Sequence, residues 1–194
     1  MTIFTVGVEA DLKLVERLTF LQEDLGKIIA SRGGDSRWVR PEYINIPLVY
    51  LGIQDDGEIP EMNHILERVV KDISPFRISI AGIQAFPDPT CPRVIQVGVD
   101  AGLESLTQLR ERIRYAMTEA NFGFDPRPFK ASMMLGRVLT PNQKVDISDA
   151  IDAIKDLNFG GTDIYEIALY NASLSLTGTI HFVVSRHALT GNVR

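Results

Sequence analysis

The chain has 194 residues, of which 45 % are hydrophobic and 23 % are charged, proportions that are ordinary for a folded globular protein. Its net charge of −5 and its pI of about 5.2 argue against a broad electrostatic grip on nucleic acid, although a local basic cleft is compatible with them. The single cysteine, Cys91, excludes an internal disulfide framework and favours a reducing compartment.

Nothing in the sequence indicates a membrane span. No stretch is apolar over the roughly 20 residues that a membrane-spanning helix needs. The first residues, MTIFTVGVEADLK, have neither the basic start nor the long apolar run of a signal peptide. We therefore expect a cytoplasmic protein.

Strand and helix patterns alternate along the chain. In chain order they predict a strand over 4–9, a helix over 12–30, a strand over 44–51, a helix over 61–73, a strand pair over 77–86 and 93–99, a helix over 103–120, a strand over 129–138, a short helix over 147–157, and closing strands over 164–171 and 178–186. This order predicts an α+β protein with mixed sheets.

Two of the predicted strands carry small or polar residues among apolar ones. Alternate side chains share a face of a strand, so Asn45 and Pro47 are expected to point one way, and Ser132 and Met134 are expected to share a face of the other strand. On the opposite faces we expect Ile46, Leu48 and Tyr50, and Met133 and Leu135. The segments are offset by 132 − 45 = 87 positions, which hints at an internal duplication.

The segments RWVRPEYINIPLVYLG and DPRPFKASMMLGRV, together with FTVGVEADLKLVERL near the start, resemble the two-histidine (2H) phosphoesterases. The similarity is to the LigT-like branch, the RNA 2′,3′-cyclic phosphodiesterases also called 2′-5′ RNA ligases, and it covers nearly the whole chain. The resemblance implies a single bilobal domain over 1–194, with two mixed or antiparallel sheets around a central cleft and helices outside.

The family signature, His-x-Thr/Ser followed by an apolar residue, occurs twice in its members. When the flanking residues are aligned, the first motif reads Asn45-Ile46-Pro47-Leu48 and the second reads Ser132-Met133-Met134-Leu135. The resemblance therefore implies that both histidines and both hydroxyl partners are replaced. The vestigial motif positions are Asn45, Pro47, Ser132 and Met134.

These replacements bear directly on catalysis. Family members use the paired imidazoles as acid and base about a cyclic phosphate, because a histidine pKa lies near neutral. Asn45 and Ser132 do not titrate there, and each lost acid–base partner typically costs on the order of 10²–10⁴ in rate. The remaining histidines, His64, His181 and His187, have no ligand or triad spacing, and we interpret them as structural or surface residues.

Four basic residues near the motifs are candidates for ligand binding. Lys130 and Arg137 flank the second motif position, and Arg37 and Arg40 precede the first. They are expected to form an anion- or nucleotide-binding rim with Asn45 and Ser132 as neutral hydrogen-bonding groups. The alternative is that Trp38 packs in the core and the basic residues form a solvated edge.

Three functional hypotheses follow from the sequence. The first is a non-catalytic 2H-fold protein, a pseudoenzyme, that acts as an interaction or scaffold subunit with a protein partner. The second is a nucleotide- or phosphate-ester-binding protein that uses the remnant cleft. The third is residual RNA 2′,3′-cyclic phosphodiesterase activity, which needs a cleft-facing acid or base that the sequence does not reveal. We predict no metal site and no cofactor.

Overall fold

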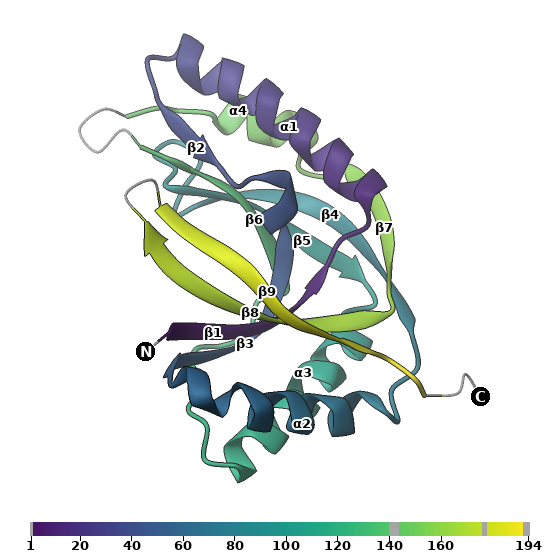
Figure 1. Cartoon of the computed structure of the whole chain (residues 1–194). Coiled ribbons are helices and arrows are strands. Elements are labelled where there is room, and N and C mark those ends of the chain that lie inside the picture. The colour runs from purple at the N-terminus through teal and green to yellow at the C-terminus, as the bar shows by residue number, and fades with distance from the viewer. Residues whose placement is uncertain (1, 140–143, 176–177, 192–194) are drawn as a thin grey trace.

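The computed structural model describes residues 2–139, 144–175 and 178–191. Two antiparallel sheets face each other (Figure 1). The first sheet has the strand order β3 (Asn45–Gln54), β1 (Thr2–Glu9), β8 (Glu166–Ser175) and β9 (Gly178–Ala188). The second has the order β2 (Ser36–Trp38), β6 (Ser132–Val138), β5 (Val94–Ala101), β4 (Phe76–Phe86) and β7 (Asn158–Ile164). The predicted α+β class is confirmed, and every described strand pair is antiparallel rather than mixed.

The helices cover the outer faces of the sheets (Figure 1). α1 (Leu12–Ser31) and α4 (Ser148–Ile154) pack on the second sheet, and α2 (Ile59–Val70) and α3 (Leu103–Glu119) pack on the first. Short 3-10 turns precede β3 (Pro41–Tyr43) and α2 (Asp56–Glu58). Two strands, β2 and β7, were not predicted, because β2 is three residues long and β7 contains two adjacent glycines that weaken the strand pattern.

An extra residue in β3 changes which side chains face the cleft. Val6 pairs with Val49 and the next residue, Gly7, pairs with Pro47, so Leu48 is left without a partner. Such a bulge shifts the alternation of side chains by one position. Leu48 and Val49 are therefore both buried, and Tyr50 is 44 % exposed on the face of Asn45 and Pro47. The prediction that Tyr50 points the opposite way is wrong.

A similar extra residue occurs in β6. Ile95 pairs with Gly136 and Gln96 with Met134, which leaves Leu135 unpaired. Leu135 and Gly136 are consequently both buried, and Arg137 is exposed on the same face as Met134. The bulges thus give both motif strands an additional cleft-facing side chain.

Trp38 packs between the second sheet and α1, as the core-packing interpretation expected. It is partly buried and packs against the apolar core, and its ring lies beside two glycine positions, Gly26 of α1 and Gly136 of β6. A Cβ added at Gly136 would lie 2.5 Å from Trp38 Cε3 and 2.9 Å from the Arg37 carbonyl oxygen. Gly136 therefore fixes how closely β2 and its tryptophan approach β6.

We expect Gly136→Ala to lower the free energy of unfolding by about 2 kcal/mol or more, because backbone and ring must both move to admit the methyl group. Chemical denaturation measures the change. Gly123→Ala is the matched control, since the nearest atom to an added Cβ there is 3.9 Å away. Equal stability of the two variants would contradict the packing described for Trp38.

On the outer side of the first sheet, His187 is buried beneath α2 at 6 % exposure. Its Nε2 lies 3.2 Å from Asn63 Oδ1 and 3.1 Å from Ser185 Oγ, and Ser185 Oγ donates to Asn63 Oδ1 over 2.5 Å. Burial lowers the pKa of His187, and the nearby Glu67 carboxylate partly opposes this effect. The folded protein therefore favours the neutral imidazole.

This pKa shift predicts a loss of stability in mild acid. Below about pH 6.5 an unfolded histidine binds a proton that buried His187 resists, so the free energy of unfolding falls as pH drops through this window. Denaturation at pH 7 and pH 5 should show this fall, and it should be smaller in His187→Asn. His64 is exposed on α2, so His64→Asn is the control variant. If the free energy of unfolding falls as much in His187→Asn as in the wild type, His187 is not the cause of the acid sensitivity.

Candidate functional site

A pocket of about 540 Å³ opens between the two motif strands. Its walls come from β3, β6, the neighbouring strands β4 and β5, helix α3, and the segment that follows α3. The lining residues are Pro47, Leu48, Val49, Tyr50, Phe86, Gln96, Arg110, Phe124, Asp125, Arg127, Pro128, Phe129, Lys130 and Ser132. The pocket is mostly apolar and aromatic, with a few polar groups at its edges, as is common in small-molecule sites.

Two of the four vestigial motif positions meet in this pocket. Pro47 and Ser132 both line it, whereas Asn45 and Met134 do not. Asn45 turns its Nδ2 to the Tyr43 carbonyl oxygen at 3.0 Å. Met134 is 39 % exposed on the face of β6 that carries Ser132. The pocket is therefore not filled by Met134.

Pro47 fits its strand without disrupting the sheet. β3 is an edge strand that pairs only with β1, where a residue without an N–H is tolerated. Its partner in register is Gly7, at which an added Cβ would lie 2.7 Å from the Ile46 carbonyl oxygen. The close approach of the two backbones at Gly7 holds Pro47 at the edge of the cleft.

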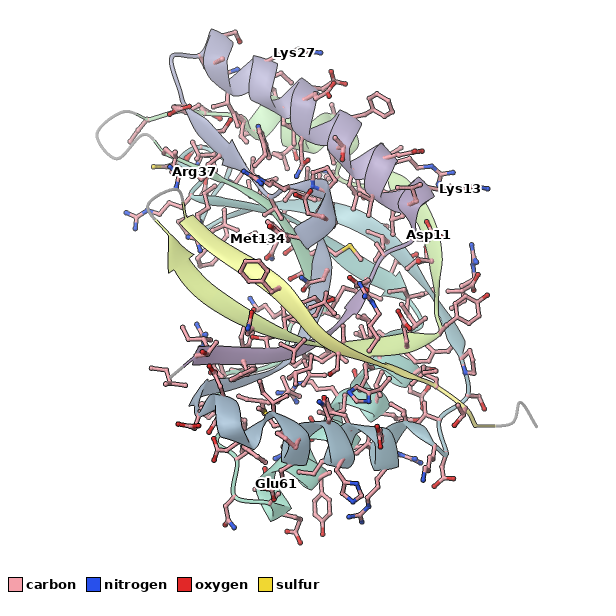
Figure 2. All side chains as sticks on the ribbon, viewed as in Figure 1. Asp11, Lys13, Lys27, Arg37, Glu61 and Met134 are labelled. Atoms are coloured by element: carbon pink, nitrogen blue, oxygen red, sulfur yellow. The ribbon has the colours of Figure 1, made fainter. Side chains whose placement is uncertain are left out.

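The four basic candidates occupy different surroundings. Lys130 lines the pocket, and no ion pair involves it within the described residues. Arg37 and Arg137 are directly opposite each other across β2 and β6, outside the pocket lining. Figure 2 marks Arg37 and Met134 on these neighbouring strands. Arg40 is 71 % exposed and lies 3.9 Å from Glu42.

Arg37 and Arg137 form a pair of like charges. Cross-strand neighbours of the same charge repel each other, and neither has a carboxylate partner in the described part of the chain. An anion bound beside them would relieve this repulsion. The pair therefore extends the basic character of the second sheet beyond the pocket.

Arg110 is a pocket residue that sequence reasoning missed. Its side chain is 12 % exposed and forms an ion pair with Glu111. Its Nε donates to the Leu48 carbonyl oxygen over 3.1 Å, and its guanidinium lies 4.9 Å from the centre of the Phe129 ring. The available signal was its place on α3, one position after buried Leu109. Arg110 joins α3, the bulge of β3 and the segment after α3.

The mouth of the pocket is closed on one side by an ion pair. Arg127 donates to the Asp125 carboxylate, and these hydrogen bonds lower the pKa of Asp125. The Asp125 amide donates to the Tyr50 carbonyl oxygen over 3.0 Å, and burial raises the pKa of the Tyr50 phenol. Asp125 and Arg127 largely neutralise each other, so Lys130 is the cation that remains without a partner among the described lining residues.

The first sheet also places a carboxylate beside the first motif position. Glu9 pairs in register with Asn45, and Arg186 donates to its two oxygens over 2.9 and 3.2 Å. Arg186 also lies 3.2 Å from Glu166. Glu9 is an acidic group beside the first motif position that the sequence did not reveal, because only the strand register brings it to Asn45.

None of the described histidine side chains reaches the pocket. His64 is exposed on α2, and His187 lies on the outer side of the first sheet. The side chain of His181 is outside the described residues. The described lining of the pocket therefore contains no imidazole.

No family model matches the chain. Among curated proteins, it is 28 % identical over 158 residues to the RNA 2′,3′-cyclic phosphodiesterase of Aquifex aeolicus, covering 80 % of this chain and 82 % of the relative. It is also 28 % identical over 176 residues to the enzyme of the same name from Archaeoglobus fulgidus, covering 91 % and 94 %.

Solved structures share the whole architecture. TT0787 of Thermus thermophilus aligns with a TM-score of 0.79 at 22 % identity, covering 98 % of this chain and 100 % of that protein. E. coli LigT in its apo form aligns with a TM-score of 0.75 at 18 % identity, covering 97 % and 98 %. These likenesses confirm the two-sheet fold, and the sequence relatives support the resemblance to the LigT-like 2H phosphoesterases. No helix in the described residues is long and apolar enough to cross a membrane.

Proposed function

We propose that this protein binds a nucleotide or a related phosphate ester in the cleft and does not turn it over. The observation that carries the proposal is the pocket between Pro47 and Ser132, which keeps the shape of a ligand site and an unpartnered Lys130 but holds no imidazole among its described lining residues. Structures of E. coli LigT have been solved with 3′-AMP and with phosphate, which supports this class of ligand. A cytoplasmic location is part of the proposal.

The expected contacts follow from the chemistry of the lining. Lys130 provides a charged donor for a phosphate oxygen, and Ser132 provides a hydroxyl that both donates and accepts. Aromatic rings of Tyr50 and Phe86, which are 44 % and 58 % exposed, offer apolar surface for the rest of the ligand. The four signature positions supply no acid–base pair, so binding is not followed by proton transfer.

We expect Lys130→Ala to weaken binding of 3′-AMP by on the order of 3- to 10-fold at low salt, because it removes one exposed charge-assisted contact. Isothermal titration measures the affinity. Lys13→Ala is the matched control, since Lys13 is an exposed lysine on α1 (Figure 2). Absence of any nucleotide binding, or equal affinity of Lys130→Ala and wild type, would remove the proposal.

A non-catalytic protein of this fold also suits the role of an interaction subunit. The exposed apolar side chains beside the cleft, Tyr50, Phe86 and Met134, favour this second possibility. Recovery of the protein from its source under mild conditions separates the two. A stoichiometric protein bound over the cleft supports the subunit role, and a bound nucleotide supports the ligand role.

Residual cyclic phosphodiesterase activity is the remaining candidate, favoured by the names of the sequence relatives and by Glu9 beside Asn45. In this case Glu9 would act as the general base in place of the first imidazole. We expect no turnover of 2′,3′-cyclic AMP above a mock purification. Turnover that is lost in Glu9→Gln and retained in Glu61→Gln, a change on exposed α2 (Figure 2), would establish hydrolysis instead.

A further inference from the structure

Three polar side chains form a continuous row across the second sheet. Gln84 and Gln96 are opposite each other in β4 and β5, and Gln96 Nε2 donates to Gln84 Oε1 over 3.2 Å. Ser132 Oγ in β6 donates to Gln96 Oε1 over 3.3 Å. The row therefore connects an exposed amide at one end with the second motif position at the other.

The strand register explains why these three residues meet. Gly98 is the partner of Ser132 and has no side chain, so the hydroxyl reaches diagonally to Gln96, two positions along β5. Gln96 and Ser132 line the pocket, whereas Gln84 does not. A change at Gln84 can consequently affect a ligand in the pocket only through Gln96 or through long-range charge.

The hydrogen bonds of this row can run in either direction. An amide turned by 180° keeps its shape while its oxygen and nitrogen exchange places. If Gln96 turns, its Nε2 donates to Ser132 Oγ and its Oε1 accepts from Gln84. The Ser132 hydroxyl hydrogen is then available to the ligand or to the Lys130 carbonyl oxygen 3.5 Å away, whereas in the observed direction it must first leave Gln96 Oε1. Chains of this kind polarise their members together.

We propose that Gln96 is a specificity-determining positioning residue, which transmits the hydrogen-bond direction set at Gln84 to the hydroxyl of Ser132. This inference rests on the proposed function, because it concerns a ligand in the same pocket. The row allows the second motif position to meet either an acceptor or a donor on the ligand. A phosphate monoester presents both kinds of group, since its second pKa is about 6: a dianion has only acceptor oxygens, and a monoanion also has a P–OH donor.

A carboxylate at position 84 should fix the direction of the hydrogen bonds along the row. In Gln84→Glu the carboxylate can only accept, so Gln96 must keep Nε2 toward it and Oε1 toward Ser132. At pH 7.5 the hydroxyl must then give up its hydrogen bond to Gln96 Oε1 before it can donate to the phosphate dianion. We expect the affinity for 3′-AMP to fall about 5- to 10-fold, the effect of one lost hydrogen bond to a charged group in a partly exposed site.

The same substitution in a Gln96→Leu background separates transmission from charge. Leu cannot pass on a hydrogen bond, so Gln84→Glu should then weaken binding by about 2-fold at most, which is the screened repulsion alone. Gln108→Glu, at an exposed glutamine of α3, controls for net charge and should leave the affinity unchanged. Titration of 3′-AMP against the four proteins of the cycle and the control gives each ratio, and urea denaturation verifies that each is folded.

Equal fold-changes from Gln84→Glu in the two backgrounds would overturn the role of Gln96 and leave the proposed function intact. A folded wild-type protein that does not bind 3′-AMP at all would overturn both. The inference is supported if Gln84→Glu lowers the affinity for 3′-AMP more in the protein with Gln96 than in the Gln96→Leu background.

Discussion

The bulges at Leu48 and Leu135 are the constraint on which the cleft depends. Each inserts one residue into a motif strand, and each turns a further side chain, Tyr50 or Arg137, toward the face that carries the vestigial motif positions. Without them a large ring and a cation would point into the packed faces of the sheets, where burial of a charge is unfavourable. The bulge of β3 therefore shapes a wall of the pocket, and the bulge of β6 places a cation on the same face outside it.

The pocket is held by contacts between separate elements. Arg110 ties α3 to the bulge of β3, and the Asp125 amide ties the following segment to Tyr50. These contacts stabilise the cavity whatever residues stand at the signature positions. Asp125 and Arg127 in its lining are paired with each other, Lys130 has no ion-pair partner among the described residues, and the row from Ser132 to Gln84 is neutral. This lining supports the proposal that the site holds a phosphate ester.

Local patterns predict the class of fold, and the resemblance implies the cleft in which Pro47 and Ser132 meet. Local patterns could not predict the face of Tyr50, because a bulge interrupts the two-residue period on which the prediction depends. The approach of Glu9 to Asn45 and of Gln84 to Ser132 is set by strand register between distant segments, which one sequence does not encode in an obvious way. Trp38 packs against the core, which was the alternative to a role in ligand binding, because Gly26 and Gly136 leave room for its ring.

The central claim is the proposal that the cleft binds its ligand but lacks the acid–base pair and the hydroxyl partners of the signature. The most direct test is turnover of 2′,3′-cyclic AMP by a variant that carries Asn45→His, Pro47→Thr, Ser132→His and Met134→Thr, compared with wild type. The account predicts no measurable turnover by wild type and a gain of about 10²-fold or more over background in the variant, since each acid–base partner contributes about that much. Turnover by wild type that the folded variant does not exceed would contradict it.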